Sequence, residues 1–156
     1  MTRAEYVGAA RARADLLYRG EAVAHRSCGI AIAETFGLPT ASYQSLRRGG
    51  LTGHGTCGAL QAGLLVLGEL LGDPDPAGPP SPALKAAAVA YRAALSSTVP
   101  GTPEDSCNTR TSAFPDFAAP ARARHCTDLA ATAAAAAAGI LWDHGRIVPI
   151  PPLPTR

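Results

Sequence analysis

The chain has 156 residues, of which 47% are hydrophobic, 17% charged and 5% aromatic, with a net charge of +2, and this composition suits one soluble globular domain. Its basic residues are scattered singly or in pairs, which excludes the electrostatic pattern of a nucleic-acid-binding protein. The longest apolar run, residues 60–71, is shorter than the roughly 20 residues that span a bilayer, and the first residues lack the profile of a secretory signal. We therefore expect a cytoplasmic protein with no membrane span.

The first two helices are predicted from their end signals. Thr2 and Glu5 have the spacing of a capping box, and the alanine-rich stretch that follows reads as a helix ending at Gly20. A second helix is expected over residues 28–36, with Gly37 just beyond its end. The run over residues 57–71 is apolar on nearly every side, which predicts a central helix that other helices surround.

Two further helices are predicted in the second half of the chain. Ser81 and Pro82 form a cap and first-position pair for a helix that reaches about Ser96. The segment 114–120 has two prolines and is expected to be irregular, so the last helix is predicted over residues 126–142. The fold class is therefore all-α, a single-domain bundle of about five helices over residues 1–145, followed by an extended Pro-rich tail over residues 146–156.

The last predicted helix also bears on oligomeric state. Residues 133–138 are an unbroken run of alanines, and alanine buries little area in a monomer. Packing against a second copy of the chain would use this helix better, so we expect a homodimer.

Four cysteines need a chemical explanation in a cytoplasmic chain. They are Cys28, Cys57, Cys107 and Cys126, and no CxxC pair occurs among them. A helix is predicted to begin at Cys28, at Cys57 and at Cys126, where backbone N–H groups and the helix dipole favour the thiolate. Thiolates are required by a metal ligand or by a nucleophile, so a four-sulfur site assembled from separate helix ends is one interpretation. The alternative is that the cysteines are ordinary small core residues.

A glycine-rich loop precedes the second cysteine. Residues 47–55 contain four glycines within seven positions, a composition that allows close backbone approach. The loop leads into the segment Gly53-His54-Gly55-Thr56-Cys57-Gly58-Ala59, which opens the apolar helix.

This segment resembles the signature of the C-GCAxxG-C-C family of redox-active proteins. Members are small and helical and have four cysteines, to which Cys28, Cys57, Cys107 and Cys126 correspond in order. The resemblance spans roughly residues 17–140. The chain has Ala62 where the family motif usually has glycine, with Gly63 one position later. The resemblance implies a redox function, and related domains are similar to part of the split-Soret cytochromes, which have a non-haem iron-sulfur centre beside their haems. The present chain lacks a CxxCH motif, which excludes c-type haem attachment.

The leading hypothesis is an iron-sulfur cluster, [2Fe–2S] or [4Fe–4S], held by Cys28, Cys57, Cys107 and Cys126. Backbone groups of the loop at Gly55, Thr56 and Gly58 are expected to contact the cluster, and His125 is expected to supply positive charge beside it. His54 is a candidate second-shell donor or general acid or base. Arg47, Arg48, Arg110 and Arg124 are candidates for further compensating charge.

Two other hypotheses use the same cysteines. The first is a metal-free thiol/disulfide redox or sulfur-transfer enzyme in which Cys57 is the nucleophile. The second is a structural protein in which the four thiolates bind zinc. If the chain is an enzyme, we expect an oxidoreductase, with a redox partner protein or a small molecule as its substrate.

Overall fold

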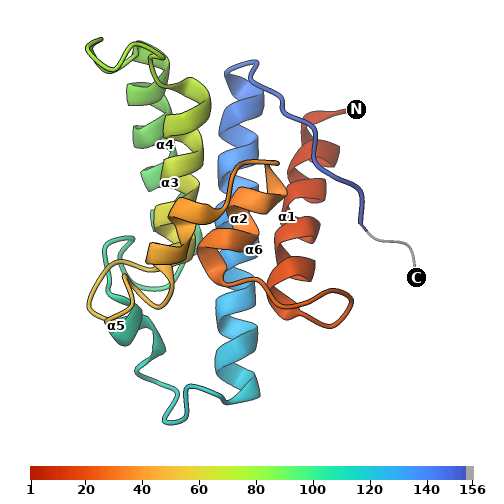
Figure 1. Cartoon of the computed structure of the whole chain (residues 1–156), viewed down its shortest axis with the longest axis vertical. Helices are drawn as coiled ribbons and strands as arrows, with labels where there is room; N and C mark the ends of the chain where they lie inside the picture. The colour runs from red at the N-terminus through yellow and green to blue at the C-terminus, as the bar shows by residue number, and fades with distance from the viewer. Residues whose placement is uncertain (154–156) are drawn as a thin grey trace.

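The computed structural model of the chain describes residues 1–153. That part of the chain forms six α-helices and one 3-10 helix and no strands, apart from one isolated bridge between Thr56 and Ser106. The all-α prediction is therefore confirmed. The elements, drawn in Figure 1, are α1 (Arg3–Arg19), α2 (Cys28–Thr35), η1 (Ala41–Leu46), α3 (Gly58–Leu71), α4 (Pro82–Thr98), α5 (Cys107–Thr111) and α6 (Pro120–Asp143).

The predicted helix caps are present. At α1 the Thr2 hydroxyl accepts a hydrogen bond from the Glu5 N–H at 3.2 Å, and the Glu5 carboxylate accepts one from the Thr2 N–H at 2.6 Å. Gly20 ends α1 in the left-handed conformation, with φ +74°. At α4 the Ser81 hydroxyl accepts from the Leu84 N–H at 3.1 Å. Local side-chain chemistry thus sets these helix ends as the sequence predicted.

The start of the last helix differs from the prediction. α6 begins at Pro120, so Cys126 lies inside the helix and not at its start. Pro120 occupies the first helical position, where the missing N–H costs no hydrogen bond and the fixed φ suits the helix. Pro120 therefore begins a helix and does not interrupt one. The argument that a helix start favours the thiolate does not apply to Cys126, which lies inside α6.

The helix with the most extensive packing against the rest of the fold is α6. It packs against α1, α2, α3 and α4, and Figure 1 shows it behind α2 and between α3 and α1. The predicted central helix, α3, packs on α2, α4, α6 and η1, but Leu64 and Leu65 on its outer side are 36% and 40% exposed.

Four of the six alanines in the run over residues 133–138 of α6 are buried within the chain itself. Ala133, Ala134, Ala137 and Ala138 have no exposed surface, because their small side chains let the neighbouring helices approach closely. The alanine run therefore needs no second copy of the chain to cover it. The homodimer prediction loses the observation on which it was based.

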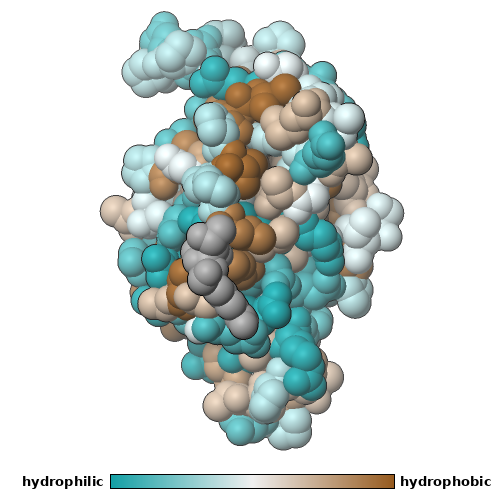
Figure 2. Space-filling view, turned by 90° about the vertical axis from the view of Figure 1, so that its right-hand side faces the viewer, coloured by the Kyte–Doolittle hydropathy of each residue, from teal (hydrophilic) through white to brown (hydrophobic). Residues whose placement is uncertain are grey.

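Residues 146–153 extend along the outside of α1. The Val148 N–H donates to the Tyr6 hydroxyl at 3.3 Å, and the Arg13 guanidinium donates to the Pro152 carbonyl at 3.0 Å. Figure 2 shows this face, on which hydrophobic residues form a broken column. The last three residues of the predicted tail, 154–156, lie outside the described residues. Among the helices of residues 1–153, none is both long and apolar enough to cross a bilayer.

Candidate functional site

All four cysteines line one pocket of about 190 Å³, called here the cysteine pocket. Each is a free thiol. Cys28 is the first residue of α2, Cys57 caps α3, Cys107 is the first residue of α5, and Cys126 lies in α6. Four elements that are far apart in the sequence thus bring the thiols together.

Gly58 allows two of these cysteines to approach each other. A Cβ atom at this position would lie 2.8 Å from the Cys28 sulfur and 2.2 Å from the carbonyl oxygen of Leu46. No side chain fits at those distances. The glycine that follows Cys57 in the motif is therefore required by the packing of α2 and η1 against the start of α3.

The glycine-rich loop holds the helix that begins with Cys107. The Cys107 N–H donates to the Gly55 carbonyl and the Asn108 N–H donates to the Gly53 carbonyl, both at 2.9 Å. Gly49 has φ +58°, and a Cβ atom there would lie 2.8 Å from the Cβ of Cys107. The Gly55 N–H donates to the Gly49 carbonyl at 2.9 Å. This N–H is used inside the loop, so Gly55 contributes to the fold of the site and does not offer a free donor to it.

The segment just before Cys57 pairs with the segment just before Cys107. Thr56 and Ser106 form an isolated antiparallel bridge. Thr56 does not line the cysteine pocket, whereas Gly58 does. The bridge fixes the two cysteine-bearing turns side by side.

Burial controls the ionisation of the thiols. It raises the pKa of Cys28 to about 12, and it raises the pKa of Cys57 and Cys107 as well. The N–H groups of Leu60 and Ala59 oppose this effect at Cys57, and the Gly29 N–H opposes it at Cys28. The prediction that a helix start favours the thiolate is therefore wrong for Cys28 and Cys57, because desolvation outweighs the helix N-terminus at both.

The charged side chains that line the cysteine pocket are all basic. They are Arg47, Arg48 and Arg122, and neither aspartate nor glutamate lines it. In the part of the chain described, none of these three arginines lies within 4.0 Å of a carboxylate, although six other arginines form ion pairs. The pocket therefore combines four thiols with uncompensated positive charge.

Arg122 organises one wall of the pocket. It donates to the Tyr18 hydroxyl at 2.9 Å and to the Phe117 carbonyl at 2.5 Å. Its guanidinium lies 4.2 Å from the centre of the Phe117 ring, and that of Arg48 lies 4.8 Å from the same ring. Burial is the main cause that raises the pKa of Tyr18, followed by the charge of Cys126.

Sequence reasoning missed Tyr18, Phe117 and Arg122. Arg122 precedes Cys126 by four residues and thus shares its face of α6. This spacing would have identified Arg122 if the helix had been predicted to begin at Pro120.

The two histidines predicted for the site do not line the cysteine pocket. His54 is exposed on the glycine-rich loop, where its N–H donates to the Thr52 hydroxyl at 3.2 Å. The His125 ring packs against Phe114, with 5.3 Å between ring centres, and its Nε2 is buried without a hydrogen-bond partner among residues 1–153. Burial is the main cause that lowers the pKa of His125, followed by the charge of Arg110.

The spacing of the thiols bears on what they could bind. Within residues 1–153, no three His, Cys, Asp or Glu side chains gather closely enough to hold a metal ion. A tetrahedral zinc ion requires every sulfur to lie about 2.3 Å from one point. The pocket that the four thiols line together with other side chains has a volume of about 190 Å³, far larger than the ~15 Å³ that one water requires. Ser27, which also lines the pocket, has a buried hydroxyl with no hydrogen-bond partner.

Comparisons of the chain with family models, with curated proteins and with solved structures find no match.

Proposed function

We propose that this chain is a redox protein whose four cysteines hold an iron-sulfur cluster. The observation that carries the proposal is that all four thiols line one pocket whose charged side chains are all arginines. Such a cluster, when bound, supplies reversible electron transfer.

The donor set supports a cluster over zinc. Iron-sulfur clusters take four cysteine ligands, and several cluster atoms lie between the sulfurs, so the thiolates need not converge on one point. Cys28, Cys57, Cys107 and Cys126 would be these ligands. The structural zinc hypothesis is supported less well, because no three His, Cys, Asp or Glu side chains gather closely enough to hold one metal ion within residues 1–153.

The burial of the thiols supports a cluster over a metal-free nucleophile. A reactive thiol needs a lowered pKa, whereas burial raises the pKa of Cys57 and of two of its neighbours. A coordinating metal deprotonates a thiol outright, so high pKa values are compatible with ligands. The metal-free thiol/disulfide enzyme stays the second candidate, since the four thiols are free and share one pocket.

The arginines have a defined role in this proposal. Four thiolates bring four negative charges into a partly buried pocket, where unpaired charge is costly. Arg47, Arg48 and Arg122 line the pocket without carboxylate partners of their own and would offset that charge. The Phe117 ring, which both Arg48 and Arg122 contact, would keep these two guanidiniums in position.

Single cysteine variants test the proposal. Each of Cys28→Ser, Cys57→Ser, Cys107→Ser and Cys126→Ser, purified without oxygen, should lose most of the iron and sulfide of the wild-type protein, because each change removes one thiolate ligand. The matched control is Thr127→Ser, a small change at a buried residue next to Cys126 that does not line the cysteine pocket. Circular dichroism checks that the variants fold. Wild-type iron and sulfide in the Cys57→Ser and Cys126→Ser variants would contradict a four-thiolate site.

A further inference from the structure

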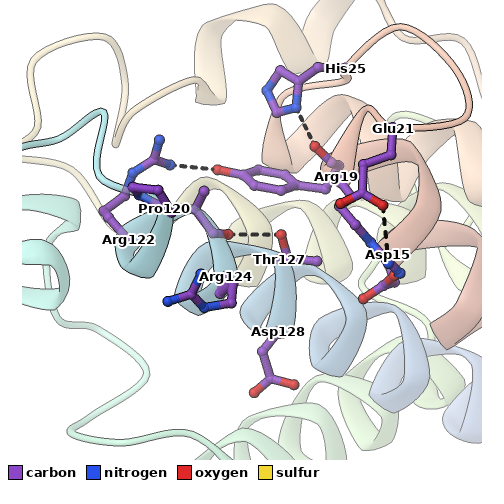
Figure 3. A pocket seen from close by; sticks show the side chains of 11 residues that line it. Asp15, Arg19, Glu21, His25, Pro120, Arg122, Arg124, Thr127 and Asp128 are labelled. Carbon is purple, nitrogen blue, oxygen red and sulfur yellow. Dashed lines mark hydrogen bonds and ion pairs between the residues drawn. The ribbon is translucent and has the colours of Figure 1, made fainter.

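A second and larger pocket, of about 760 Å³, lies between the end of α1 and the beginning of α6. Figure 3 shows Asp15, Arg19 and Glu21 on one side of it and Arg122 and Arg124 on the other. Its volume falls within the range of small-molecule sites, roughly 300–1,000 Å³. We call it the α1/α6 pocket.

The α1/α6 pocket and the cysteine pocket share a wall. Tyr18, His25 and Arg122 line both pockets. The hydrogen bond between Tyr18 and Arg122 fixes two of these side chains, and Arg122 also interacts with Cys126. A molecule in the α1/α6 pocket would therefore be separated from the cysteine pocket only by this layer of side chains.

The loop that supplies His25 is held in place by the backbone. Gly20 adopts φ +74°, and a Cβ atom there would lie 2.8 Å from the Cβ of His25. The Arg26 N–H donates to the Leu17 carbonyl at 2.8 Å, and a His25 ring nitrogen contacts the Tyr18 carbonyl. The shared wall is thus built before any ligand arrives.

The acidic groups of the α1/α6 pocket each have an arginine partner, although Asp15 and Glu21 share one guanidinium. Asp15 and Glu21 both pair with Arg19, and Asp128 pairs with Arg11 at 2.7 Å. The two other arginines of the pocket, Arg122 and Arg124, form no ion pair among residues 1–153. Arg122 bonds to neutral oxygens of Tyr18 and Phe117, and Arg124 has no ion pair or hydrogen bond among residues 1–153. Two guanidiniums in one pocket are therefore left without a carboxylate.

We propose that the α1/α6 pocket binds a small organic anion through Arg124, the arginine of this pocket that has no ion pair or hydrogen bond among residues 1–153. A guanidinium binds carboxylate, phosphate or sulfonate oxygens by charge-assisted hydrogen bonds, and the ring of Tyr18 with Pro120 and Ala123 provides apolar surface for the rest of the molecule. The further step, that this anion is the substrate of the redox site, rests on the function proposed above.

Paired ligands of equal shape test the proposal. Ligand-observed NMR on the protein as purified would compare benzoate with benzamide and 2-naphthoate with 2-naphthamide. We expect saturable binding of the carboxylates and at least tenfold weaker binding of the amides. Arg124→Gln should weaken carboxylate binding about tenfold, as for the loss of one charge-assisted hydrogen bond. Arg124→Lys should retain part of it.

The matched control is Arg146→Gln, an exposed arginine that lines neither pocket, and it should bind carboxylates like the wild type. Absence of carboxylate binding, equal binding of acids and amides, or an unchanged affinity in Arg124→Gln would overturn the proposal. Iron and sulfide are measured on the same samples. Anion binding without iron would point to a failure of the redox proposal, and iron without anion binding to a failure of this one.

Discussion

At the scale of single residues, the four cysteines illustrate how burial competes with a helix terminus. Sequence alone identified every one of them, because their number and the glycine-rich context of Cys57 stand out. Their ionisation was not predictable in the same way. It depends on desolvation by helices that are distant in the sequence, and desolvation is the largest cause of the raised pKa at Cys28, Cys57 and Cys107.

The raised pKa of Cys28 predicts a pH-dependent stability for the metal-free protein. In the unfolded chain this thiol ionises near pH ~8.5, whereas in the folded chain burial raises its pKa to about 12. Above pH ~8.5 the unfolded chain therefore binds fewer protons than the folded chain, and the free energy of unfolding falls. For this one group the fall is about 1.4 kcal/mol per pH unit, up to the folded pKa.

Urea unfolding of the metal-free protein between pH 7 and pH 10 measures this effect, with Cys28→Ala as the reference. The stability of the wild type relative to Cys28→Ala should be constant below pH ~8 and should decline above it. A constant difference across the whole range would show that Cys28 is not desolvated in the folded chain.

At the scale of elements, the sequence predicted those helices whose ends have their own signals. The capping box of α1, Gly20, and the Ser81-Pro82 pair of α4 act locally, so they can be recognised without the fold. The helices η1 and α5 are too short to show a periodic pattern of apolar residues in the sequence. Tertiary hydrogen bonds hold α5 to the glycine-rich loop. The start of α6 was missed because proline can begin a helix as well as interrupt one.

The junction between α2, η1 and α3 gives a prediction at this scale. Gly58→Ala should lower the free energy of unfolding by about 1–3 kcal/mol, because the added Cβ meets the Leu46 carbonyl and the Cys28 sulfur. Gly68→Ala in the same helix is the matched control, since a Cβ there has no neighbour within 4 Å. This control should gain about 0.5–1 kcal/mol from its better helix propensity.

Urea denaturation of the two variants and of the wild type measures whether Gly58→Ala lowers the free energy of unfolding and Gly68→Ala raises it. A Gly58→Ala protein as stable as the wild type would mean that α2 and η1 do not approach the start of α3 this closely. The same variant should also hold less iron, because its clash includes the sulfur of Cys28.

At the scale of the whole molecule, the site depends on where the fold brings side chains together. Sequence reasoning identified Arg47, Arg48 and the four thiols, but the wall of Tyr18 and Arg122 forms only because α1 packs along α6. The predicted histidines were chosen for their closeness in sequence to cysteines. His54 lies on the glycine-rich loop and His125 lies in α6, and neither lines the pocket that the cysteines line.

Whether the four thiols together hold one iron-sulfur cluster is tested by the iron and acid-labile sulfide content of wild-type protein purified without oxygen, with its visible absorption spectrum. We expect iron and sulfide in matching amounts and a visible absorption band that bleaches on reduction. Colourless protein that contains neither, and that cannot be reconstituted with iron and sulfide, would contradict it.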